Sequence, residues 1–463
     1  MNMLPTNRKA LIIYALVIIA ALIFILLPDT ASKEVSPINS SKAVNIQEWK
    51  TTTGAKVLYV YAPELPMLDI QAIFNAGSVR DGDKAGIASL TNSLMSHGAK
   101  LGNKTLSVDD ISESFENIGA RFGAGASKEN AKISLRTLTD EKLLRKAIAT
   151  MQAVVSAPTF DTKELERVRK QLLIAFEGRK QSAGTIASEK LYKSLYAKHP
   201  YARPSIGTEE SIKKLTRDDL IDFYKKHYVA ENALVTIVGD VDRKKAESLA
   251  EKIIGSLPKG EKTIGLPDVK DLQTASSIHH EFPSSQTHIL MGQPGVHRKD
   301  KDYFVLYVAN HILGGSGFGS RIMEEIREKR GLAYSSYSYF SPMLKRGPFI
   351  IGMQTSNKQT DEALKVLKDT LADFIANGVT EKELKHSKKN ITGGFPLRID
   401  SNSDISNYLA VIGFYNLPLS YLKDFSKKVE AVTLEQIKDA VKRRIDPDKM
   451  ITVTVGTRHN EKQ

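Results

Sequence analysis

Cysteine is absent from the 463 residues of the sequence. Its absence excludes disulfide bonds, thiolate zinc sites and cysteine nucleophiles. Basic residues are also not confined to one stretch: the 66 lysines and arginines are scattered among 53 aspartates and glutamates, although the net charge is +13. We therefore predict that the chain binds no nucleic acid. The length of the chain predicts at least two domains.

A long run without charged residues lies near the N-terminus, at residues 10–27. It is long enough to cross a bilayer as a helix. Arg8 and Lys9 precede it and Asp29 follows it, so the positive-inside rule places the N-terminus in the cytoplasm. The alternative is a cleaved signal peptide, but its apolar run would be shorter, and Asp29 occupies the −3 position of the only suitable cleavage site, after Ala31. An uncleaved transmembrane anchor is therefore favoured.

The flanks of this run complete the expected topology. Residues 1–9 are predicted to be a cytoplasmic N-terminus, and the polar residues 28–42 a tether. In a Gram-negative bacterium, this arrangement predicts a single-pass protein of the inner membrane with its body in the periplasm.

The body of the chain shows alternating strand and helix patterns. Apolar runs predict strands at residues 57–62 and 70–76, and helical spacing predicts a helix at 86–96. Ser107 and Asp110 match a capping box that opens another helix. Further strands and helices are predicted at residues 121–126, 131–138, 141–156, 162–179, 216–226 and 233–238. This order is typical of an α+β domain.

A long internal repeat divides the body into two halves. Residues 216–239 align without a gap on residues 433–456, at an offset of 217. Residues 163–176 match residues 382–395 at an offset of 219. This period is too long for a solenoid and indicates a duplicated domain. We predict two homologous domains and a linker, at residues 43–267, 278–463 and 268–277 respectively.

The stretch GGSGFGSRIMEEIREKRGLAY, residues 314–334, combines a glycine-rich loop, a charged helix that stops at Gly331 and the start of an aromatic strand. The loop does not match a phosphate-binding loop, because it follows an apolar helical run and no Lys-Ser/Thr pair closes it. Nucleotide binding is therefore not predicted. The glycines concerned are Gly314, Gly315, Gly317 and Gly319.

Several motifs together resemble the insulinase or pitrilysin family of zinc peptidases, in its short two-domain form. They are GIASL, IGARFGAGASKENAKISL, SAPTF with the following ELER helix, LGGSGFGSRI and REKRGLAY, and the resemblance covers about residues 43–457. It implies two homologous α+β domains. The glycine-rich loop resembles a short version of the loop in the non-catalytic subunit of processing peptidases, where glycines would let a peptide approach the backbone.

The metal site that the resemblance implies is missing its ligands. Active members carry H-x-x-E-H on the helix after a G-[LIV]-A motif, here the GIA of GIASL, and a glutamate on a later helix. Ser89 and Ser93 stand at the two histidine positions, Asn92 at the base and Ala175 at the third ligand. Serine hydroxyls are poor zinc ligands and asparagine accepts no proton, so we predict no metal and no catalytic residue in this chain. Three histidines are predicted to be structural: His97, His279 and His280.

The substrate-binding pair that the resemblance implies is present. Family members hold an arginine and a tyrosine spaced R-x₆-Y, and the matching residues are Arg327 and Tyr334. A guanidinium and a phenol can donate hydrogen bonds to substrate carbonyls and to an oxyanion. The alternative interpretation is a solvated helix arginine and a core tyrosine.

Two functions stay open. The first is a metal-degenerate subunit of a heterodimeric zinc metallopeptidase, in which a homologous partner supplies H-x-x-E-H and the zinc ion for cleavage of unstructured peptides. The second is a structural or scaffold pseudo-peptidase in a membrane complex. Retention of the R-x₆-Y pair after loss of the metal site favours the first.

Overall fold

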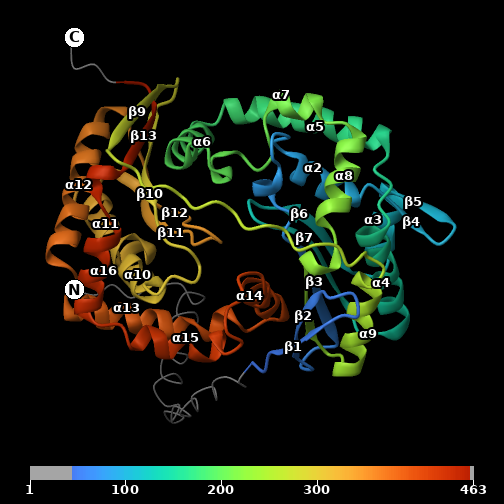
Figure 1. Ribbon diagram of the computed structural model, residues 1–463. Helices are drawn as coiled ribbons and strands as arrows, with labels where there is room; N and C mark the ends of the chain where they lie inside the picture. Colours follow the sequence, from blue (N-terminus) through green and yellow to red (C-terminus); the bar gives the residue numbers. More distant parts are fainter. Residues whose placement is uncertain (1–43, 459–463) are drawn as a thin grey trace, which may run out of the picture. The chain divides into compact units, whose positions relative to one another are not determined.

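Two β-sheets organise residues 44–458, the part of the chain that this computed structural model describes (Figure 1). The predicted cytoplasmic N-terminus, transmembrane anchor and tether, residues 1–42, lie outside the described residues. Within residues 44–458, no helix is both long and apolar enough to span a bilayer.

The first domain contains a six-stranded sheet. Its strand order is β1 (Gln47–Lys50), β2 (Lys56–Tyr61), β8 (Ala233–Gly239), β3 (Met67–Phe74), β7 (Ala131–Leu138) and β6 (Arg121–Ala126). β2 and β8 pair in parallel, and the other neighbours pair antiparallel. The predicted strands at 121–126 and 131–138 are confirmed with these bounds; a short turn joins them, and β7 alternates in burial along its length.

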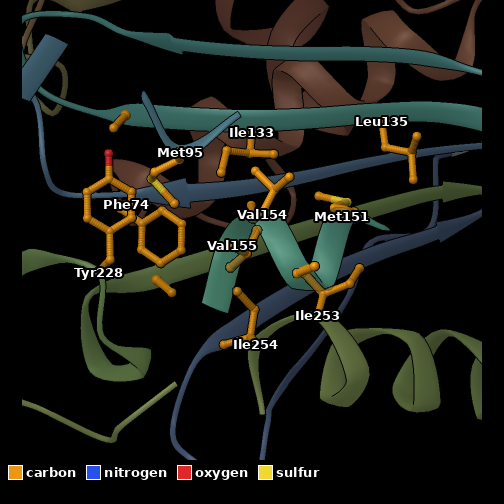
Figure 2. Close-up of a cluster of buried hydrophobic side chains, with 14 of the residues drawn as sticks. Phe74, Met95, Ile133, Leu135, Met151, Val154, Val155, Tyr228, Ile253 and Ile254 are labelled. Carbon is orange, nitrogen blue, oxygen red and sulfur yellow. The ribbon is translucent and has the colours of Figure 1, made fainter. Parts of the chain in front are cut away.

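The helices of this domain pack over one face of the sheet, some directly on its strands and others on neighbouring helices. They are α2 (Ile87–Met95), α3 (Val108–Glu116), α4 (Glu141–Ser156), α5 (Thr162–Lys180), α7 (Glu209–Lys214), α8 (Arg217–His227) and α9 (Arg243–Ile254). The predicted capping box is confirmed: the Ser107 hydroxyl accepts a hydrogen bond from the Asp110 backbone N–H, and the Asp110 carboxylate accepts one from that of Ser107. Figure 2 shows part of the core, with Met151 and Val154 of α4 beside Ile133 of β7.

The second domain repeats this plan with a five-stranded sheet. Its order is β11 (Ala333–Phe340), β12 (Pro348–Ser356), β10 (Gln286–Pro294), β13 (Ile451–Gly456) and β9 (Ser276–Glu281). Its longer helices are α10 (Tyr303–Asn310), α12 (Thr360–Asn377), α13 (Glu381–Gly394), α15 (Tyr421–Glu430) and α16 (Leu434–Arg444). The repeated segments fold alike: α8 with β8 corresponds to α16 with β13, and each of these strands pairs in parallel with the first long strand of its domain.

Each sheet receives a helix from the other domain on its second face. α6 (Ala183–Tyr196) of the first domain packs on β10 and β13, and α14 (Asn402–Phe414) of the second packs on β8 and β3. Successive side chains of β2 point to opposite faces of the sheet, which explains the contact with α14. Val57 and Tyr59 point into the core of the first domain, whereas Leu58 and Val60 join a core with residues of the second. The two domains are therefore interlocked.

A buried carboxylate also ties the domains together. Glu129, in the turn between β6 and β7, accepts hydrogen bonds from the Leu344 backbone N–H (2.9 Å) and the Tyr415 hydroxyl (2.8 Å), both in the second domain. The Tyr201 hydroxyl of the first domain donates a third. We call this group the Glu129 clasp. Burial raises the pKa of Glu129 above its ordinary value, and the three donors oppose that shift.

Candidate functional site

The R-x₆-Y pair is brought together in the structure. The guanidinium carbon of Arg327 lies 4.4 Å from the ring centroid of Tyr334 and 4.6 Å from that of Phe318. Both rings are open to solvent, with exposed fractions of 81% for Tyr334 and 64% for Phe318. A cation over an aromatic face at an exposed site is stabilised by about 0.5–1 kcal/mol. The charge of Arg327 is therefore held between two rings at the surface.

Arg327, Phe318 and Tyr334 form a trio, and segments close together in the sequence position its three side chains. Phe318 lies in a 3₁₀ turn, η5 (Gly317–Gly319), and Arg327 in a π-helical turn, η6 (Glu324–Glu328), which continues α11 (Arg321–Met323). Tyr334 lies near the start of β11. The charged helix predicted here is thus only three α-helical residues followed by a wider turn, with Lys329 N–H bonded to Glu324 C=O. π-turns of this kind are frequent at functional sites.

Arg327 differs from the basic residues beside it in its lack of a carboxylate partner. Lys329 and Arg330 both pair with Glu325, at 2.6 Å. In residues 44–458, no hydrogen bond or ion pair engages the Arg327 side chain; only the two rings contact it electrostatically. Its N–H donors are therefore available to a ligand carbonyl or carboxylate. This contrast argues against an ordinary salt-bridged helix surface.

The predicted glycine loop is partly helical. Gly314 and Gly315 end a π-helical turn, η4 (His311–Gly315). A Cβ on Gly314 would lie 2.6 Å from the backbone nitrogen of Ser338 in β11, so this glycine permits close packing of the turn on the strand. Gly317 has a φ of +68°, which glycine adopts readily, whereas Gly319 has no such requirement. Sequence reasoning missed Phe318; the available signal was a single aromatic residue between glycines.

The degenerate metal positions lie on α2 and α5, which pack against each other. Asn92, at the base position, is fully buried, and its amide donates to the Tyr228 hydroxyl at 3.2 Å. Ser89 and Ser93 are half-buried, and Ala175 is exposed beside Ile174, itself 74% exposed. This donor set does not fit zinc, because it offers no imidazole, thiolate or carboxylate.

Two of the three histidines predicted to be structural, His97 and His279, make hydrogen-bond contacts. His97 Nδ1 lies 2.7 Å from the Ser93 carbonyl oxygen at the end of α2, and His279 contacts Thr454 and Glu281. Across residues 44–458, no three histidine, aspartate or glutamate side chains are grouped to hold a metal ion. In the same range, no hydrogen bond, ion pair or ring contact joins Arg327 or Tyr334 to the degenerate positions.

Comparison with known families covers most of the body. Residues 56–209 match the family model of the insulinase peptidases, peptidase family M16, and residues 214–391 match the model described as the peptidase M16 inactive domain. The boundary between the two matches falls on α7, inside the first domain of the structure.

Individual relatives agree with these matches. The chain is 27% identical to the "Non-peptidase homolog YmxG" of Helicobacter pylori, over 88% of this chain and 94% of that protein. It is 28% identical to an uncharacterized zinc protease of Bacillus subtilis, over 68% of this chain and 75% of that protein. A crystal structure described as the peptidase M16 inactive domain from Pseudomonas fluorescens shares 42% identity at a TM-score of 0.87, covering 90% of this chain and 99% of that one. The chain therefore belongs to the insulinase peptidases, family M16, and has their two-domain α+β fold.

Proposed function

We propose that the chain is the metal-degenerate subunit of a heterodimeric zinc metallopeptidase. The observation that carries this proposal is the half-buried Arg327, held between the exposed rings of Phe318 and Tyr334 with its N–H donors unoccupied by the described residues. The name of the Helicobacter pylori relative, a non-peptidase homolog, supports the lack of catalysis by this chain alone.

The role assigned to these residues is peptide binding and positioning. Arg327 donates hydrogen bonds to backbone carbonyls of an unstructured peptide, and the rings of Phe318 and Tyr334 keep its guanidinium in place. The Tyr334 hydroxyl donates to the carbonyl oxygen on which negative charge develops during cleavage. A homologous partner with H-x-x-E-H would supply the metal ion and the general base.

We further propose that the protein is anchored in the bacterial inner membrane by residues 10–27, with the body in the periplasm of a Gram-negative cell. The uncharged length of that run and the basic residues before it support this placement. The substrates would then be unstructured peptides of that compartment.

Co-expression with an H-x-x-E-H homologue from the same genome tests the proposal. The tagged full-length chain is captured from solubilised membranes, and cleavage of an unstructured peptide is measured for each protein alone and for the pair. We expect the pair to form and to cleave faster than the partner alone, and this chain alone to be inactive. A stable pair that cleaves no faster than the partner, or recovery of this chain only with itself, would favour the scaffold function instead.

A further inference from the structure

A concave site in the second domain shares no lining residue with α2 or with the group of Arg327, Phe318 and Tyr334. It is a cavity of about 620 Å³, bounded by α10, both ends of α15, the loops before these helices and the start of α16. Its volume falls within the range of about 300–1,000 Å³ that small-molecule sites occupy. We call it the α10–α15 cavity.

The charges on its wall are almost all positive. Arg298, Lys299, Lys301 and Lys428 line the cavity, and in the described part of the chain none of them forms an ion pair. The only acidic residue in the wall, Asp300, is neutralised by Arg444 at 2.8 Å from outside the cavity. Like charges on the low-dielectric wall of a concave site reinforce one another's field and raise the local concentration of anions.

The same wall carries aromatic rings. Phe304 and Tyr303 of α10 lie beside Tyr421 of α15. The Lys428 ammonium is 5.3 Å from the Phe304 ring centroid, so a cationic group and a flat apolar surface meet at one point of the cavity. A planar ligand ring could stack on such a surface while an attached anionic group reaches the lysines.

Hydrogen bonds satisfy the Arg298 side chain only in part. Its Nη1 donates to the Tyr303 hydroxyl at 3.2 Å, but its buried Nε–H has no hydrogen-bond partner among residues 44–458. A buried donor of a charged side chain that stays unpaired is costly, and such groups in native proteins commonly mark a bound ion or water.

We propose that the α10–α15 cavity binds a small organic anion: a phosphate or carboxylate group carried on a flat aromatic ring. The lysines and Arg298 bind the anionic group, and Phe304 with Tyr303 binds the ring. This site is separate from the peptide-binding role of Arg327 and does not depend on it.

Titration calorimetry on the full-length protein tests the site with three probes: 1-naphthyl phosphate, inorganic phosphate and 1-naphthol. We expect 1-naphthyl phosphate to bind with a stoichiometry of one and at least about tenfold more tightly than either of the others, since each part of the ligand contributes. Equal affinity for 1-naphthol would overturn the proposal, because the cations would then contribute nothing. Absence of binding at millimolar 1-naphthyl phosphate would overturn it as well.

Charge-matched variants separate the cavity from the overall positive charge of the protein. The triple variant Lys299→Gln, Lys301→Gln, Lys428→Gln should bind 1-naphthyl phosphate at least about tenfold more weakly. The control variant Lys385→Gln, Lys423→Gln, Lys427→Gln changes exposed lysines of α13 and α15 that lie outside the cavity and form no ion pair within residues 44–458, and it should bind normally. An equal loss in both would assign the binding to bulk electrostatics and refute the site.

A third variant tests the ring surface. Phe304→Leu keeps an apolar side chain of similar bulk and removes the aromatic face. This variant should bind 1-naphthyl phosphate several-fold more weakly and should bind inorganic phosphate with unchanged affinity. Unchanged binding of both probes would show that the ring is not used.

Discussion

Arg327 has no carboxylate partner among the described residues, and two aromatic rings hold its guanidinium in position instead. A carboxylate would fix the side chain equally well but would occupy its N–H donors. Ring faces attract the cation from the sides and leave the edge of the guanidinium free for hydrogen bonds. This arrangement suits a residue that must be ordered before a ligand arrives.

The first prediction concerns this trio in the reconstituted pair. Tyr334→Phe should lower turnover by about 10²–10³, the usual effect of losing one donor to a developing oxyanion. Arg327→Ala should lower kcat/KM and also raise KM, because the arginine positions the peptide. Phe318→Ala should have a smaller, few-fold effect, since one ring contact contributes about 0.5–1 kcal/mol. The measurement is peptide cleavage at matched concentrations of both subunits.

Arg330→Ala is the matched control, because Arg330 lies just beyond η6, close to Arg327 in the sequence, but is paired with Glu325. Its kinetics should stay at the wild-type level, and all variants should still form the pair. If Arg327→Ala and Tyr334→Phe also cleave at wild-type rates, the trio is structural and the scaffold function gains support.

The second prediction concerns the degenerate metal positions. The purified chain should contain no stoichiometric zinc and cleave no peptide. Ser89→His, Asn92→Glu and Ser93→His together should not restore cleavage, because Ala175 leaves the site one ligand short. Asn92→Glu should also lower the melting temperature, since it places a carboxylate at a fully buried position beside Tyr228.

Metal analysis by mass spectrometry, together with a chelator-sensitive peptidase assay, measures this outcome. Stoichiometric zinc in the wild-type chain, with cleavage removed by chelation, would contradict the assignment of a degenerate site. The variant Ser93→Ala, at a half-buried position on the same helix, provides a control for non-specific effects on stability.

At the scale of helices and strands, local sequence patterns predicted several elements well. Ser107 and Asp110 lie three residues apart, so their capping box could be recognised without tertiary information. The alternation of residues 131–138 likewise predicted β7 with its observed bounds. Both patterns depend only on residues that are close together in the sequence, so they can be recognised without knowledge of the tertiary structure.

Features that depend on distant residues could not be predicted in this way. The π-helical turns η4 and η6 share the apolar spacing of ordinary helices over their few residues, so the sequence indicated only helix. The packing of α6 and α14 on the sheets of opposite domains depends on partners far along the chain. Phe318 was missed for the same reason: its role appears only when the turn η5 brings it beside Arg327.

The third prediction concerns the packing of η4 on β11. Gly314→Ala should reduce the free energy of unfolding by about 1–3 kcal/mol, because the added Cβ meets the backbone of Ser338 and the turn must shift. Gly319→Ala is the control in the same loop; its Cβ would meet only the Ser316 hydroxyl, at 3.6 Å. Chemical denaturation measures the free energy of unfolding of both variants. Equal values would show that the turn η4 can shift without loss of stability.

At the scale of the whole molecule, duplication has produced two domains that complete each other. The sheet of the first is covered by α14 of the second, and α6 of the first covers the sheet of the second. Close packing at this exchange is visible at Gly413 of α14, where a Cβ would lie 2.6 Å from the Leu234 side chain of β8. Separation of the domains would therefore expose apolar surface on both sheets.

The fourth prediction follows from this exchange. Residues 43–267 and 278–463, produced separately, should each be unstable and prone to aggregation, whereas their co-expression should yield a soluble complex. Gel filtration and circular dichroism measure the outcome. A soluble, cooperatively folded first domain on its own would show that α14 is dispensable for its stability.

The last prediction uses the Glu129 clasp as a pH-dependent contact between the domains. Burial raises the pKa of Glu129, so the folded protein holds its proton to a higher pH than the unfolded chain does. The stability that this proton provides is complete below the ordinary glutamate pKa of about 4.3 and is lost as the pH rises through the folded-state pKa. Arg298, whose charge acts on Glu129, opposes the shift, and Tyr201 and Tyr415 face the carboxylate as donors.

Glu129→Gln removes the titration but keeps the shape, so wild type should lose stability relative to this variant as the pH rises from 4.5 to 8. Denaturation of both proteins across that range measures the difference, and Glu48→Gln, an exposed carboxylate on β1, is the control. Parallel stability profiles for wild type and Glu129→Gln would show that Glu129 stays ionised in the folded protein and that the clasp is insensitive to pH.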